Sequence, residues 1–153
     1  MAVFRFRMQN ILNMKEKLEE QAKQDFAQAQ KEYFDEVEQL EHLKKRKEDY
    51  IAYGVELRNK SIDIQELRDN KYAIERMDDY IKEQELAVTM AQKKMDAAMR
   101  KMMDARTETK TYEKLREHDF EAFMIEEGKK ESKEIDELNS YRFSRKGEDG
   151  VQA

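Results

Sequence analysis

The chain has 153 residues, of which 42% are charged and 39% are apolar, and its formal net charge is -5. It contains no proline, no cysteine and only four glycines. So few apolar residues exclude a compact globule with a large core, the lack of cysteine excludes disulfides and thiolate sites, and the acidic balance argues against nucleic acid as a partner. This composition is typical of long helices with solvated outer faces.

The first half of the chain is predicted to form one helix over about residues 4–53, followed by a loop over residues 54–62. Thirty-two residue steps divided among nine intervals average about 3.56 residues, which predicts only a slight supercoil. The small or apolar residues that define this spacing are Ile11, Met14, Leu18, Ala22, Phe26, Ala29, Tyr33, Val37, Leu40 and Leu43. Gly54 predicts that the helix ends at Tyr53, because glycine suits the left-handed position past a helix end.

The second half is predicted to form a helix over about residues 63–143, with a flexible tail over residues 144–153. Asp63 and Glu66 have the spacing of a capping box at its start. Its apolar side chains follow an unbroken heptad repeat made by Leu67, Ile74, Ile81, Val88, Met95 and Met102, with Met77, Ala91, Ala98, Ala105 and Tyr112 on the interleaved positions. Two facing stripes joined by a short loop predict an all-α fold, a long antiparallel two-helix coiled coil in one elongated domain.

The second helix is expected to overhang the first. Folding the chain about the middle of the loop places Tyr50 near Leu67 and Phe4 near Tyr112, so residues beyond about 115 have no partner in the first helix. Two alternatives stay open for the free protein. The second helix bends at Gly128 and the tail folds back, or the tail frays, because an interior glycine costs about 1 kcal/mol relative to alanine.

Residues with the spacing of a catalytic or metal site are not found in the sequence. His42 and His118 have no ligand spacing around them, no cysteine accompanies them, and no glycine-rich phosphate loop is present. The basic run at residues 44–47 is flanked by acids and indicates a solvated helix face. We therefore expect no enzyme activity, no cofactor, no metal and no insertion into a membrane.

Both ends of the chain resemble one protein family. The opening Phe4-Arg5-Phe6-Arg7 is similar to the amino-terminal signature of the FliJ family of flagellar type III export proteins. The stretch Lys114-Leu115-Arg116-Glu117, followed by Glu131-Ser132-Lys133-Glu134-Ile135-Asp136-Glu137-Leu138, is similar to the closing pattern of that family. The order and separation of these motifs carry the resemblance, which covers nearly the whole chain.

The resemblance implies a non-enzymatic, cytoplasmic component of the flagellar export apparatus, peripherally associated with the inner membrane. It further implies likeness to the central stalk of rotary ATPases, and three partners: the export ATPase ring, which the stalk enters and stimulates, the cytoplasmic domain of the export gate protein, and export chaperones. We expect a monomer in isolation. A self-associating structural tether and a substrate-specific secretion chaperone remain as alternatives.

The resemblance also implies two sets of binding residues. The candidates for gate binding are Gln39, Leu43, Tyr50, Ala73, Met77, Tyr80 and Gln84. The candidates for ATPase-ring binding are Phe4, Phe6, Phe120, Phe123, Met124, Lys133, Asp136, Glu137 and Leu138. From spacing alone, Tyr80 lies off the seam and is expected to be exposed, whereas Met77 and Gln84 lie on its second row at the core or its edge. Arg46 stands where some family members carry an aromatic residue.

Overall fold

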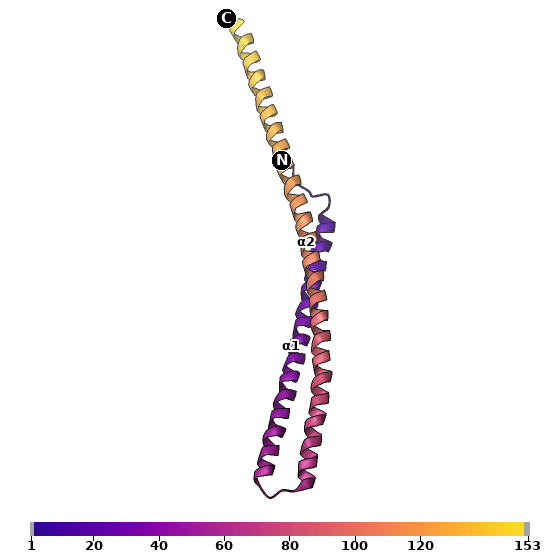
Figure 1. The fold of residues 1–153 in the computed structure, drawn as a ribbon. Helices are drawn as coiled ribbons and strands as arrows, with labels where there is room; N and C mark the ends of the chain where they lie inside the picture. Colours follow the sequence, from indigo (N-terminus) through magenta and orange to yellow (C-terminus); the bar gives the residue numbers. More distant parts are fainter. Residues whose placement is uncertain (1, 152–153) are drawn as a thin grey trace. The chain divides into compact units, whose positions relative to one another are not determined.

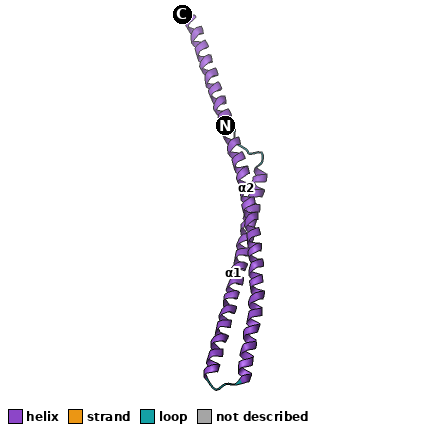
Figure 2. Cartoon of the chain, viewed as in Figure 1, coloured by secondary structure: helices purple, strands orange, loops and turns teal. Residues whose placement is uncertain are grey.

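The structure, a computed structural model, describes residues 2–151 of the chain and the side chains of residues 2–147. Two helices account for the regular structure of that part, α1 over Gln9–Asn59 and α2 over Ile64–Val151 (Figures 1 and 2). They pair in antiparallel order, so the prediction of an all-α helical hairpin is confirmed. No helix in residues 2–151 is long and apolar enough to cross a membrane.

The chain divides into two compact units, and both helices contribute to each. We call Leu18–Ala105 the bend unit, and Met1–Lys17 with Arg106–Ala153 the terminal unit. The expectation of one elongated domain over residues 1–153 stays a prediction.

In the bend unit, α2 buries the residues that its heptad repeat predicts. Met77 is buried, and the other seam residues of this unit, from Leu67 to Ala105, are half-buried. Burying apolar side chains along this stripe is the main source of stability for such a pair.

The seam of α1 follows its prediction from Ala22 to Leu43, where all seven predicted residues are buried or half-buried, and differs from it nearer the N-terminus. The buried and half-buried positions of the bend unit include two interleaved rows with steps of seven, so the period is the 3.5 of a coiled coil. One row is Glu19, Phe26, Tyr33, Leu40, Lys47 and Gly54, and the other is Ala22, Ala29, Glu36, Leu43, Tyr50 and Leu57. Leu18 is half-exposed, and in the terminal unit Ile11 and Met14 are also exposed while Leu12 is buried. The prediction was wrong at these three exposed positions, and it left out Glu19 and Lys47 because local hydropathy passes over charged residues.

The turn also lies later in the chain than predicted. α1 continues past Gly54 to Asn59, and Gly54 has an ordinary helical conformation without positive φ. The Asp63 cap is confirmed, since the Gln65 main-chain N–H donates to Asp63 Oδ1 at 2.9 Å. With the loop reduced to residues 60–63, Tyr50 lies opposite Asn70 rather than Leu67.

In the terminal unit, residues 2–8 are not helical, although the first helix was predicted from residue 4. The Phe4 ring lies against Phe120 and Phe123, with ring centroids 5.3 and 5.5 Å away. An extended segment advances about 3.3 Å per residue, whereas a helix advances about 1.5 Å. Phe4 therefore reaches past Tyr112, the residue that it was expected to lie near. We predicted that residues beyond about 115, which include Phe120 and Phe123, have no partner in the first helix, predicted from about residue 4. The contacts with Phe4 show that this prediction was wrong for Phe120 and Phe123.

Beyond this contact, α2 remains a helix to Val151 and passes straight through Gly128. Every side chain from residue 128 to residue 147 is exposed. The predicted helix end at residue 143 was thus too early, and a bend at Gly128 is not observed. Residues 152 and 153 of the predicted tail lie outside the described residues.

Candidate protein-binding surfaces

The predicted gate-binding residues all lie in the bend unit, but they differ in exposure. Gln39 and Tyr80 are exposed on opposite helices. Leu43, Tyr50, Ala73 and Gln84 are half-buried, and Met77 is only 4% exposed. A partner that binds the paired helices can therefore touch Gln39 and Tyr80 fully, and Met77 hardly at all.

Gln84 is tied to α1. Its Nε2 donates to the main-chain oxygen of Glu36 at 2.8 Å and makes a second hydrogen bond to the Glu36 carboxylate. These contacts satisfy the amide inside the hairpin, so the structural role of Gln84 competes with a role in partner binding.

Tyr80 is held in place on the surface by Arg76, which the sequence reasoning missed. Arg76 Nη2 donates to Tyr80 Oη at 3.1 Å, and the guanidinium carbon lies 5.2 Å from the centre of the Tyr80 ring. The hydrogen bond from Arg76 to Tyr80 raises the pKa of Arg76, helped by the charge interactions with Tyr80 and Tyr72. Spacing of four residues between a cation and an aromatic ring was the signal that could have revealed this pair.

Tyr50 borders a shallow hollow between the helices. Tyr53 lines it from α1, and Glu66, Asp69 and Ala73 line it from α2. Tyr53 is 49% exposed and was also missed by the sequence reasoning. The hollow offers two aromatic rings and two carboxylates to a partner side chain.

The predicted ring-binding residues lie in the terminal unit and fall into two groups. The first group, at the packed end of the unit, contains Phe4, Phe6, Phe120 and Phe123. Phe6 is buried, Phe4 and Phe123 are half-buried, and Phe120 is 46% exposed. The guanidinium of Arg116 lies 5.9 Å from the centre of the Phe4 ring. Phe6 thus has a structural role in this unit.

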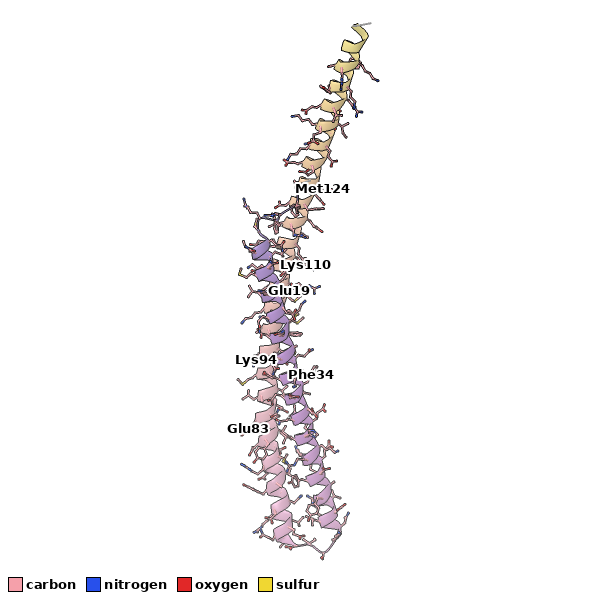
Figure 3. The ribbon with its side chains drawn as sticks, turned by 180° about the vertical axis from the view of Figure 1, so that it is seen from behind. Glu19, Phe34, Glu83, Lys94, Lys110 and Met124 are labelled. Carbon is pink, nitrogen blue, oxygen red and sulfur yellow. The ribbon has the colours of Figure 1, made fainter. Side chains whose placement is uncertain are left out.

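The second group, made by Met124, Lys133, Asp136, Glu137 and Leu138, is exposed on α2. Beyond the level of Met124, Figure 3 shows side chains that stand out from α2 alone. Ile135 was not among the predicted residues, yet it is exposed and lines a shallow surface with Leu138, Glu131 and Arg142. These residues present apolar and charged groups side by side, which suits contact with another protein.

The described residues contain no group of three or more His, Cys, Asp or Glu side chains that could hold a metal ion. What the surfaces offer is exposed aromatic, aliphatic and charged side chains on helices.

Residues 4–148 match the family model described as Flagellar FliJ protein. The chain belongs to the FliJ family. A relative from Bacillus subtilis (strain 168), the Flagellar FliJ protein, is 27% identical over 145 residues, which cover 94% of this chain and 98% of the relative. No solved structure matches the chain. The resemblance inferred from the two ends of the sequence is thereby confirmed, and it identifies the chain as a member of a flagellar protein family.

Proposed function

We propose that this FliJ-family chain is a non-enzymatic component of the flagellar type III export apparatus that acts as a stalk in the export ATPase ring. The observation that carries the proposal is the exposed part of α2, where residues 128–147 are helical and every side chain is exposed. A single helix of this kind has the width of about 10–12 Å that a narrow central channel can accept.

The chemistry of that helix supports the same role. Ile135, Leu138 and Tyr141 are each more than half exposed. Burying one large apolar side chain contributes roughly 1.5–3 kcal/mol, so a ring that covers all three gains substantial binding free energy. Charged residues between them keep the free protein soluble until the ring is reached.

The test is a truncation after Glu127, assayed with the cognate ring ATPase. This cut keeps Phe120 and Phe123, which pack on Phe4, so the helical hairpin should melt at nearly the same temperature as the full chain. Binding to the ring and stimulation of ATP hydrolysis should fall by at least about tenfold, because contacts worth more than about 1.4 kcal/mol are removed together. Full stimulation by the truncated chain, or ATP hydrolysis by the chain alone, would overturn the proposal.

The proposal includes a second contact, made by the bend unit with the cytoplasmic domain of the export gate protein. The exposed residues Gln39 and Tyr80 are its best placed members, and Tyr50 and Tyr53 lie in the same unit. Export chaperones complete the set of proposed partners, and the working place of the chain is the cytoplasmic side of the inner membrane.

Replacing Gln39 and Tyr80 together by alanine should weaken gate binding, measured by calorimetry, while helical content is unchanged because neither side chain is in the seam. Tyr72→Ala is the matched control, since Tyr72 is exposed on α2 but is not a candidate for gate binding. Equal loss of binding in the control would show that any exposed tyrosine in this region has the same effect.

A further inference from the structure

The hollow near the turn of the bend unit combines two kinds of side chain. Tyr50 and Tyr53 line it from α1, and Glu66 and Asp69 line it from α2. The members of each pair are three residues apart, so they lie on one face of their helix, about one turn from each other. Two aromatic rings from one helix therefore border the same hollow as two carboxylates from the other.

No cation of the chain neutralises these carboxylates. Glu66 and Asp69 are exposed, and neither makes an ion pair within the part of the chain whose side chains are described. Asp69 accepts only the neutral amide of Gln65, at 3.2 Å. Arg46 lines an adjoining hollow with the same two tyrosines, yet within residues 2–147 it forms no ion pair and lies over neither ring. Like charges three residues apart repel each other, so the pair gains from a cation supplied by another molecule.

Asn70 adds a hydrogen-bond acceptor to the hollow. It lines the hollow, is 7% exposed, and uses its Nδ2 to donate to the main-chain oxygen of Tyr50 at 2.8 Å. Its Oδ1 accepts no hydrogen bond from residues 2–147, and it is open to solvent, because every buried side-chain N and O atom of that part has a partner. Gly54 makes room for this oxygen, since a Cβ on residue 54 would overlap it. A nearly buried amide with an unused acceptor favours a ligand that donates hydrogen bonds.

An arginine side chain matches all three features. Its guanidinium carries a permanent positive charge and five N–H donors, so it can bind carboxylates and an amide oxygen together. Its flat face also stacks on aromatic rings, which a lysine ammonium cannot do in the same way. We propose that the hollow bordered by Tyr50, Tyr53, Glu66 and Asp69 is a binding site for an arginine side chain of a partner protein.

The site lies in the same unit as the candidates for gate binding, and Tyr50 belongs to both sets. The inference rests on the side chains of the hollow and not on the proposed export function. It applies to whichever partner of the chain carries the arginine, and it is tested without that partner.

The test uses the full chain with isotope-labelled tyrosines, and its probe is a short blocked alanine peptide with one central arginine. Nuclear magnetic resonance follows the ring signals of Tyr50 and Tyr53 as the peptide is added. Both should shift and saturate with a dissociation constant on the order of millimolar, because exposed charge and cation–π contacts are individually weak. The same peptide with citrulline has the shape of arginine without its charge and should leave both rings unchanged. Tyr141, which is 66% exposed in the terminal unit, is the reference ring and should not respond.

Neutral variants test the carboxylates. Glu66→Gln with Asp69→Asn should weaken binding of the arginine peptide by about fivefold or more, because two charge contacts are lost together. Glu75→Gln with Asp79→Asn is the matched control, since it removes the same charge from exposed positions of α2 that do not line the hollow. This control should bind the arginine peptide as the unchanged chain does.

Tyr53→Leu is a second variant, because it removes one ring without changing the first turn of α2. The signal of Tyr50 should then report weaker binding of the arginine peptide, while circular dichroism shows unchanged helical content. The proposal would be overturned by any of three results: no saturable shift at the two rings, an equal shift with the citrulline peptide or at Tyr141, or equal weakening in the control variant.

Discussion

Gly54 shows how a single residue can be assigned the wrong role from sequence. A glycine near the end of a helical stretch is commonly a cap, because it tolerates positive φ. Here Gly54 is buried inside α1 and leaves room for the Asn70 side chain, which is held by its bond to Tyr50. The glycine is thus needed for the close approach of a side chain on the other helix.

Gly54→Ala should therefore destabilise the hairpin although alanine is the better helix former. The gain in helix propensity is about 1 kcal/mol. Displacing the buried amide of Asn70 costs about 1–3 kcal/mol and strains the helix contact as well. We expect a net loss of up to about 2 kcal/mol in the free energy of unfolding, seen as an earlier thermal transition by circular dichroism.

Gly128→Ala is the control for this change, because a Cβ at residue 128 would meet nothing within 4 Å. It should raise helical content and should not lower the transition temperature. If both alanine variants were stabilised, the contact between Gly54 and Asn70 would have no energetic weight.

Among the elements, the N-terminal segment before α1 has a larger role than its lack of helix suggests. Phe6 is buried, Phe4 packs on two rings of α2, and the Phe6 carbonyl accepts the Gln9 main-chain N–H where α1 begins. The segment thus covers apolar surface of α2 that would otherwise be open to water in the terminal unit.

Phe6→Ala should destabilise the terminal unit by about 3 kcal/mol, the lower end for a buried phenylalanine. Hydrogen exchange should become faster in α2 around residues 116–123, where the segment packs. Phe143→Ala makes the same chemical change at a side chain that is 81% exposed and should alter neither quantity. Unchanged exchange in the Phe6 variant would mean that the segment packs only weakly.

For the whole molecule, the exposed apolar residues of α2 raise the question of self-association, which is the property expected of a structural tether. Stable interfaces bury on the order of 800 Å² on each partner. The exposed apolar residues from Ile135 to Phe143 are interrupted by charges of both signs, including Asp136, Glu137 and Arg142. Such a surface suits a partner with a complementary arrangement of apolar and charged groups better than a second copy of itself.

Light scattering should accordingly give a mass near the 18.5 kDa of one chain at micromolar concentration. The truncation after Glu127 should be monomeric in the same way. A full chain that dimerises while the truncated chain does not would favour the tether over the stalk, whatever the ATPase assay shows.

The sequence alone determined the features that depend on neighbours in the chain. The heptad repeat of α2 reports its buried face because one helix turn follows another without interruption, and the Asp63 cap depends only on residues two positions away. Motifs at the two ends were enough to indicate the family, and the match of residues 4–148 to the family model confirms it.

Only the tertiary structure decided the features that depend on the partner helix. Glu19 and Lys47 are on the seam of α1 because the opposite helix fixes which face is covered, and local hydropathy left both of them out. The role of Gly54 could not be seen without Asn70, sixteen positions away in the chain, and the reach of Phe4 depended on an extended segment that no periodicity marks. The spacing of apolar residues is a property of one helix, whereas register and close approach are properties of two helices together.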